Sequence, residues 1–162
     1  SIRIEGIAAQ LSEIFYDDIP IFIGILNGSF IFLSDLIRKV NFECEIDFIK
    51  VASYDGIETT GKIILDKDIN LDIKNKRVII VEDIIDSGLT IDYLYKNILS
   101  YEPKDITIVT LLSKKENYNL NFDIEIIGFE ITTEFVVGYG LDLDQRFRQL
   151  DCLHKLKPES TA

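Results

Sequence analysis

The sequence predicts a single α/β domain built on a mainly parallel sheet that helices flank. Short apolar runs alternate with amphipathic stretches along the chain, which is the pattern of repeated strand–helix–strand units. Residues 78–81 (VIIV) are apolar throughout, as expected for a central parallel strand that is covered on both faces. No linker rich in Pro, Gly or Ser divides the 162 residues, so we expect residues 1–162 to form one domain.

The first half of the chain predicts two helices and two strands. Apolar side chains recur at helical spacing over residues 4–15, and Pro20 separates this helix from the buried strand expected at residues 21–26. An Asn-Gly turn signal follows, and residues 30–40 place their apolar side chains on one helical face. Residues 44–53 alternate well enough to predict a second strand.

The second half of the chain predicts further strands around one helix. Residues 54–62 carry two glycines and few apolar side chains, which is typical of a mobile loop between strands. The strand at residues 78–81 ends at two acids, and after a turn the apolar face of a helix runs from Ile91 to Leu99. Short strands are also expected at residues 106–112, 124–129 and 134–139, with a loop or edge strand in the polar tail after Gly140.

Composition and charge exclude several classes of function. The net charge of −11 argues against sequence-independent nucleic-acid binding, which depends on Lys and Arg, but it permits small phosphorylated ligands. No apolar run approaches the ~18 residues of a membrane span. The chain opens in helical sequence without a signal-peptide core, so we expect a short leading segment to be missing. Cys44 and Cys152 lack metal-site spacing and are interpreted as reduced thiols of a cytoplasmic protein.

The chemically informative segment is the passage from the strand at residues 78–81 into the following helix. Ligands of open α/β sheets sit outside the carboxyl ends of the strands. Gly88 at the start of a helix would let backbone N–H groups converge on an anion, and Ser87 and Thr90 add hydroxyl donors. The segment therefore predicts a phosphate site, although it matches neither a Walker loop nor GxGxxG.

Two adjacent acids, Glu82 and Asp83, end the same strand. They would repel a phosphate unless a divalent metal ion balanced their charge or sugar hydroxyls bound to them. The pattern therefore favours a ligand that carries both a phosphate and a sugar diol. A purely structural interpretation stays open at this point, in which the segment is an acidic turn and Asp86 caps the next helix.

This segment, VIIVEDIIDSGLT, resembles the phosphoribosyl-diphosphate-binding signature of type I phosphoribosyltransferases. The signature consists of an apolar strand, two acids, two apolar residues and Asp-Ser-Gly-x-Thr. Nearly the whole chain is similar, in the family's order, to hypoxanthine(-guanine) phosphoribosyltransferases. The similar segments are LNGSFIFLSDL (26–36), DFIKVASYDG (47–56), TLLSKK (110–115) and GFEITTEFVVGYGLDLDQRFRQL (128–150). Within the last segment, FVVGYGLD is typical of the branch that acts on 6-oxopurines.

The resemblance implies a fold and a reaction. The fold would be that of type I phosphoribosyltransferases, with a small hood formed by the N-terminal segment and roughly residues 130–162. The reaction would be purine salvage, in which 5-phosphoribosyl diphosphate donates its phosphoribosyl group to a 6-oxopurine such as hypoxanthine or guanine, giving IMP or GMP plus diphosphate. The family also implies Mg²⁺ as cofactor and assembly into a homodimer or homotetramer.

The same resemblance assigns residues to the sugar-phosphate donor, position by position. The loop that cradles the 5′-phosphate is matched by Asp86, Ser87, Gly88, Leu89 and Thr90. Asp86 also matches the proposed general base, which acts at the purine N7 position. The acids near the ribose hydroxyls and the metal are matched by Glu82 and Asp83.

Three further segments are assigned to the donor side. Leu26, Asn27 and Gly28 match the loop that approaches the diphosphate, where the family often has a non-proline cis peptide. Many relatives have Lys at the position of Asn27, which leaves the backbone amides as the expected contact. Other matches on the donor side are Arg148, as a diphosphate contact, and Ser53 and Tyr54, as the pair in the family's long flexible lid.

The purine side is assigned in the same way. Lys114 matches the donor to the purine 6-oxo group, which should favour a 6-oxo acceptor over the 6-amino group of adenine. Phe135 matches the ring stacked on the base, Val136 the residue whose backbone reads the base edge, and Asp142 a second metal-binding acid at this site. The residues alone leave plainer interpretations open: Lys114 as a solvated lysine, Phe135 as a core residue, and Asp142 and Arg148 as solvated charges. His154, the only histidine, matches no functional position and is interpreted as a structural or surface residue.

A non-enzymatic function is the main alternative. A regulator with the same fold would bind the same ligand without catalysis, and such proteins often lose the base-reading residues or gain a nucleic-acid surface. Here Lys114, Phe135 and Asp142 are all present and the net charge is −11, which favours an enzyme. A generic nucleotide-binding module would leave the C-terminal segment unexplained.

Overall fold

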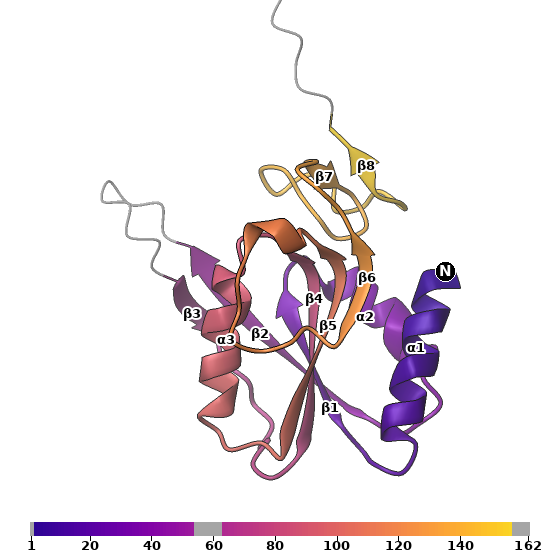
Figure 1. Cartoon of the computed structure of the whole chain (residues 1–162), viewed down its shortest axis with the longest axis vertical. Coiled ribbons are helices and arrows are strands. Elements are labelled where there is room, and N and C mark those ends of the chain that lie inside the picture. The colour runs from indigo at the N-terminus through magenta and orange to yellow at the C-terminus, as the bar shows by residue number, and fades with distance from the viewer. Residues whose placement is uncertain (1, 54–62, 157–162) are drawn as a thin grey trace, which may run out of the picture.

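The computed structural model describes residues 2–53 and 63–156 and shows a twisted sheet between helices (Figure 1). The sheet has six strands in the order β3-β2-β1-β4-β5-β6, and every neighbouring pair is parallel except β2 and β3. The predicted α/β fold with a mainly parallel sheet is therefore confirmed. The elements, in chain order, are α1 (Ile2–Phe15), β1 (Ile21–Leu26), α2 (Phe30–Ile37), β2 (Glu45–Ser53), β3 (Ile63–Lys67), β4 (Arg77–Ile85), α3 (Leu89–Leu99), β5 (Asp105–Ser113), the 3₁₀ turn η1 (Lys115–Asn117), β6 (Ile126–Glu130), β7 (Val136–Val137) and β8 (His154–Lys155).

Both faces of the sheet are covered, with α1 and α2 on one side and α3 on the other (Figure 1). Successive residues of the central strand β4 illustrate this, because strand side chains alternate between faces. Ile79 and Val81 pack into the core beneath α1 and α2, whereas Val78 and Ile80 pack into the core beneath α3. The continuous apolar run in β4 is thus explained by burial on both sides.

Helix α1 follows the predicted apolar stripe except at one edge. Its buried face consists of Ile4, Ile7, Ala8, Leu11 and Phe15. Ile14 belongs to the same stripe by spacing but is 42% exposed. At ~100° per residue Ile14 lies at the margin of the arc that these residues cover, so it reaches past the core toward solvent.

Strand β4 is longer than the sequence predicts, and its additional residues include the two acids of the predicted site. The strand expected at residues 78–81 continues past the two acids and ends only at Ile85. Parallel pairing with β5 continues through Ile84↔Leu112 and Ile85↔Ser113, and the Lys114 N–H donates to the Ile85 carbonyl at 2.9 Å. The ladder of hydrogen bonds therefore keeps residues 84–85 extended although they follow two acids.

Other bounds also differ from the sequence predictions. Helix α2 ends at Ile37 rather than at residue 40, and β7 comprises two residues rather than the six expected at 134–139. Strand β3 was not predicted; it is a short antiparallel edge strand whose side chains are only partly buried. The loop predicted at residues 54–62 lies outside the described residues.

The C-terminal segment forms a second, two-stranded sheet in which β7 and β8 pair antiparallel. This small sheet lies beyond the carboxyl ends of the parallel strands (Figure 1). Tyr139, just after β7, donates a hydrogen bond from its hydroxyl to Asp35 Oδ2 in α2 at 2.5 Å. That bond is the chief reason the Asp35 pKa is lowered, and burial is the chief reason the Tyr139 pKa is raised.

Replacing Tyr139 with phenylalanine should lower the free energy of unfolding by about 1–2 kcal/mol, because a hydrogen bond to a charged and partly buried carboxylate is lost. Tyr101→Phe is the matched control: it removes a bond of the same length, 2.5 Å, to Asp68 in an exposed setting. Urea denaturation of both variants measures the difference. Equal losses would show that the Tyr139–Asp35 contact adds no more than a surface bond.

Within residues 2–53 and 63–156, no helix combines the length and apolarity that a membrane crossing requires.

Candidate active site

The loop between β4 and α3 surrounds a small cavity at the N-terminus of α3. Gly88 has φ of 78°, a left-handed conformation that favours glycine, and a Cβ there would lie 2.8 Å from Tyr118 Cβ. The cavity measures about 100 Å³ and is lined by Glu82, Ile84, Ile85, Asp86, Ser87, Gly88, Thr90 and Ile91. Its place at the start of an eleven-residue helix suits an anion, as the sequence predicts for a phosphate.

Asp86 does not cap helix α3. The N-cap residue is Gly88, which has no side chain to do so. The Asp86 carboxylate instead accepts hydrogen bonds from Lys114 Nζ at 2.6 Å and from Asn117 Nδ2 at 2.7 Å. The bond from Lys114 is the largest cause of a lowered Asp86 pKa. The carboxylate is therefore ionised at neutral pH and oriented by two donors from the next strand connection.

Lys114 is a buried cation. It follows the last residue of β5, its backbone N–H is bonded to Ile85, and the residue is only 8% exposed. The interpretation of Lys114 as a solvated surface lysine is therefore wrong. A buried ammonium needs an anionic or strongly polar partner, and in this structure the partner is Asp86.

A second cavity, of about 150 Å³, adjoins the first one. It is lined by Asp83, Ile84, Asp86, Lys114, Glu134, Phe135, Val136, Leu141 and Asp142. Ile84 and Asp86 line both cavities, so the two hollows meet at these residues. Phe135 is 50% exposed, which contradicts its interpretation as a core residue and leaves its ring free for a planar ligand.

The acid pair Glu82 and Asp83, which lies within β4, is divided between the two cavities. Glu82 lines the first cavity and is 6% exposed, and Asp83 lines the second. Burial, followed by the neighbouring charge of Asp83, raises the pKa of Glu82 well above its ordinary value. A cation bound between these two close carboxylates would balance the negative charge that little solvent screens.

The β1–α2 loop lies against the Asp83 carboxylate. The Leu26–Asn27 peptide bond is cis, and Asn27 itself is exposed. An ideal Cβ at Gly28 would lie 1.8 Å from Asp83 Oδ2, so only glycine fits there without displacing the acid. The loop assigned to the diphosphate and the acids assigned to the ribose are therefore in direct contact.

The C-terminal segment closes onto the same loop. A Cβ at Gly140, where φ is 101°, would lie 2.1 Å from the Gly28 carbonyl oxygen. Arg148 donates to the Gly140 carbonyl at 2.8 Å and forms an ion pair with Asp142 at 2.8 Å. The Arg148 and Asp142 side chains are 19% and 25% exposed, so their interpretation as solvated charges is wrong.

Comparison with known proteins identifies this arrangement. Residues 1–144 match the family model described as the phosphoribosyl transferase domain. The chain is 42% identical over 157 residues to the hypoxanthine phosphoribosyltransferase of Escherichia coli, covering 95% of this chain and 88% of that protein. The chain belongs to the phosphoribosyltransferase family.

Solved structures of phosphoribosyltransferases show the same fold. A hypoxanthine-guanine phosphoribosyltransferase from Bacillus anthracis superimposes with a TM-score of 0.90 at 40% identity, over 96% of this chain and 92% of that one. The Trypanosoma cruzi hypoxanthine phosphoribosyltransferase in complex with IMP gives 0.89 at 33% identity, over 98% and 90%. The predicted family and fold are confirmed, whereas the roles of individual residues stay predictions.

The structure brings together most of the residues that the sequence assigns to this phosphoribosyltransferase site. Tyr54 lies outside the described residues, and the side chain of Ser53 is not described. Sequence reasoning missed Asn117, which bonds the assigned base Asp86, and Glu134, which lines the second cavity. The position of Asn117 three residues after Lys114 is a weak signal, because its contact depends on the η1 turn.

The acids of the site fit a hard divalent cation. Asp83 and Asp142 line one cavity, and Glu82 lines the cavity beside it. Carboxylate oxygens, completed by water and phosphate oxygens, are the ligands that Mg²⁺ prefers. Burial leaves the repulsion between the Glu82 and Asp83 carboxylates poorly screened by water. A bound divalent cation would offset that repulsion.

Replacing Gly28 with alanine in this phosphoribosyltransferase should lower kcat/KM by about 10²-fold or more, because the new methyl group must push the Asp83 carboxylate or the loop out of place. Gly6→Ala is the control, since a Cβ at that exposed helical position meets nothing within 4 Å. It should leave activity unchanged and raise the free energy of unfolding by up to about 1 kcal/mol. Steady-state kinetics that did not separate the two variants would contradict the assigned contact.

Proposed function

We propose that the chain is a purine-salvage enzyme that transfers the phosphoribosyl group of 5-phosphoribosyl diphosphate to hypoxanthine, and also to guanine. The observation that carries this proposal is the buried Lys114, bonded to Asp86 at the junction of two adjoining cavities. One cavity is suited to the sugar phosphate and the other to the base. The relatives named above act as hypoxanthine or hypoxanthine-guanine phosphoribosyltransferases, which supports the same substrates.

The proposed reaction joins a ring nitrogen of the purine to the anomeric carbon of the ribose while the bond from that carbon to the diphosphate breaks. The electron pair of the breaking bond leaves with diphosphate. Backbone N–H groups of residues 26–28 and the Arg148 guanidinium are the proposed donors to that leaving group. The purine proton passes to Asp86, whose carboxylate is ionised and oriented before the substrate arrives.

Recognition of the 6-oxo group falls to Lys114. Its ammonium bonds Asp86, and it lines the cavity that Phe135 and Val136 also line. The 6-oxo group of a purine is an acceptor and gives the Lys114 ammonium a second partner. The 6-amino group of adenine is a donor and offers the ammonium no acceptor. Such an unmet polar group in a closed site can discriminate by ~10⁴-fold.

The direct test is an assay of diphosphate release. The protein is incubated with Mg²⁺, 5-phosphoribosyl diphosphate and, in separate reactions, hypoxanthine, guanine, xanthine or adenine. We expect release with hypoxanthine and guanine and none above background with adenine. Binding of the donor without release for any purine would instead support a regulator with this fold.

Mg²⁺ is the proposed cofactor, held by Glu82, Asp83 and Asp142, and it supplies charge neutralisation for the diphosphate. Removing divalent ions with EDTA should abolish diphosphate release, and adding Mg²⁺ in excess of the chelator should restore it. Asp142→Asn should raise the Mg²⁺ concentration needed for half-maximal rate. Full activity in EDTA would rule out the cofactor.

Other parts of the proposal concern organisation. We propose one domain over residues 1–162, with a hood from the N-terminal segment and roughly residues 130–162. In support of the C-terminal part of the hood, β7 and β8 pair in a two-stranded sheet of their own. We also propose a cytoplasmic location, which the two free cysteines favour, and a homodimer or homotetramer, for which exposed apolar residues such as Leu99 offer surface. Light scattering on a sizing column tests the assembly.

A further inference from the structure

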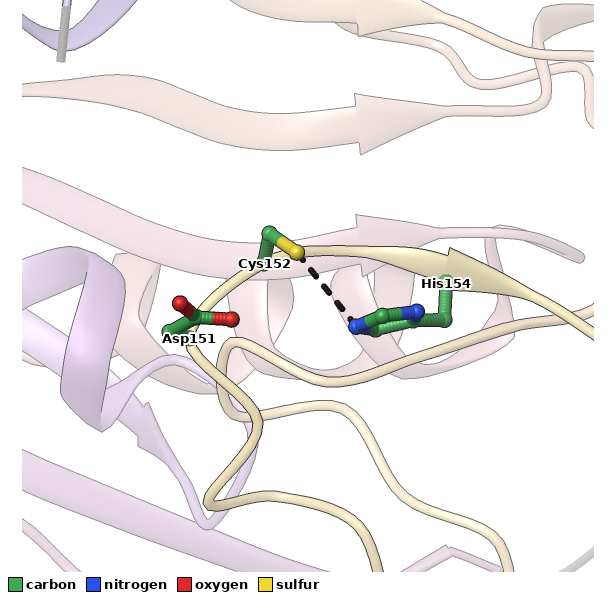
Figure 2. A group of neighbouring side chains, drawn as sticks. All are labelled: Asp151, Cys152 and His154. Atoms are coloured by element: carbon green, nitrogen blue, oxygen red, sulfur yellow. Dashed lines mark hydrogen bonds between the residues drawn. The ribbon is translucent and has the colours of Figure 1, made fainter.

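Three side chains with metal-binding atoms meet on the C-terminal segment, and none of them lines either cavity of the candidate site. Asp151, Cys152 and His154 each offer one ligand atom, and these atoms all lie within 4.8 Å of one another. Figure 2 shows the Cys152 thiol and the His154 ring pointing toward each other, with Asp151 beside them. The distance from Cys152 Sγ to His154 Nε2 is 3.3 Å. All three residues are exposed, so an ion in solution can reach them.

The chain positions this cluster through the residue between its two best ligands. Leu153 packs against the core on the α1 side of the sheet. Cys152 and His154, on either side of Leu153, are both exposed, so the burial of Leu153 leaves the two ligand side chains at the surface.

The backbone that carries the cluster is held by neighbouring elements. His154 pairs with Val137 across the β7–β8 ladder. The Tyr139 N–H donates to the Leu150 carbonyl at 2.9 Å, on the other side of the cluster. A Cβ at Gly138 would lie 2.2 Å from the Cys152 carbonyl oxygen, so these two backbone segments are in close contact.

We propose that Asp151, Cys152 and His154 form a binding site for a borderline-soft divalent cation of the Zn²⁺ class, separate from the Mg²⁺ site. Thiolate sulfur and imidazole nitrogen are ligands that Zn²⁺ prefers and Mg²⁺ does not. With Zn–S of ~2.3 Å and Zn–N of ~2.0 Å, a tetrahedral ion places the two atoms ~3.5 Å apart, close to the separation in the chain. The carboxylate would be the third ligand, and water would complete the coordination.

Charges around the cluster agree with a cation. Asp151 places a carboxylate beside the thiol and the imidazole, so the cluster offers a bound cation a negative charge next to its two preferred ligands. The adjacent Lys155 is engaged in an ion pair with Glu134 at 3.3 Å. Its charge is thereby partly balanced and opposes an incoming ion less.

The test is calorimetric titration of the whole reduced protein with Zn²⁺ in millimolar Mg²⁺, which saturates the hard acidic site. We expect about one equivalent to bind. Losing an outer-shell partner typically lowers metal affinity ~10–100-fold, so Cys152→Ser and His154→Gln, which each remove a direct ligand, should each weaken binding at least tenfold. Asp151→Asn should weaken it less.

Cys44→Ser is the matched control, because it removes the other free thiol, which is not part of the cluster. It should bind Zn²⁺ like the unmodified chain. Titration with Co²⁺ adds a spectroscopic readout: thiolate ligation gives a charge-transfer band that Cys152→Ser should lack and Cys44→Ser should keep. Absence of Zn²⁺ binding, or equal binding by Cys152→Ser, His154→Gln and the control, would overturn the proposal. Neither readout involves turnover, so the proposed enzymatic function is tested independently.

Discussion

Replacing Asp86 with asparagine is expected to lower kcat for nucleotide formation by about 10²–10⁴-fold while the protein stays folded, because the amide cannot accept the purine proton. The substitution conserves shape, and half of the Asp86 side chain is exposed, so water can reach the Lys114 ammonium that loses its anionic partner. Steady-state kinetics with hypoxanthine and far-UV circular dichroism are the two measurements. An unchanged kcat would remove Asp86 from the role of base.

A matched control for this variant lies one helical turn along α3. Asp92 and Lys96 form an ion pair of the same length as Asp86 and Lys114, 2.6 Å, but on the surface of the helix. Asp92→Asn should leave kcat unchanged and alter the free energy of unfolding by no more than about 0.5 kcal/mol. The contrast separates loss of a catalytic carboxylate from loss of any Asp–Lys pair.

Asn117 allows the orientation of Asp86 to be separated from its chemistry. Asn117→Ala keeps the carboxylate but removes the donor at 2.7 Å that fixes one of its oxygens. Its effect on kcat should therefore be smaller than that of Asp86→Asn. Equal losses in the two variants would mean that orientation, rather than proton transfer, accounts for the role of Asp86.

Local features of this fold were predictable because their causes are local. Strand β1 begins and ends where the sequence predicts, since an apolar run stands between Pro20 and an Asn-Gly turn. The turn between β4 and α3 was predictable for the same reason: Gly88 provides the left-handed conformation that a tight entry into α3 requires. Each of these features depends on neighbours within a few positions of the chain.

Features that depend on strand register were not predictable from the residues alone. The extension of β4 to Ile85 follows from its pairing with Ser113, which lies 28 positions away. The same register places Lys114 and Asn117 beside Asp86. Because these partners lie far from Asp86 in the sequence, the residues alone left open the interpretation of Asp86 as a helix cap. The burial of Arg148 likewise depends on a carbonyl, that of Gly140, which the segment reaches only when folded.

Replacing Lys114 with alanine is expected to reduce the preference for hypoxanthine over adenine, measured as the ratio of kcat/KM values, by up to ~10⁴-fold. The physical reason is that the buried ammonium is the only assigned donor to the 6-oxo group, and its removal leaves a cavity that no longer distinguishes an oxo from an amino substituent. Most of the change should be a loss of hypoxanthine use.

The neighbouring Lys115 supplies the control for this variant. Its side chain is 68% exposed and it pairs with Glu130 at 3.7 Å, so Lys115→Ala removes an equal charge outside the cavity and should leave the preference intact. Lys114→Ala should also change the titration of Asp86, whose pKa is lowered chiefly by the Lys114 hydrogen bond. Without that bond the pKa rises, so the carboxylate becomes protonated at higher pH as the solution is acidified. Carboxyl-carbon NMR over an acid titration measures this, and an Asp86 pKa that did not move would show that the ion pair between the two cavities is absent in solution.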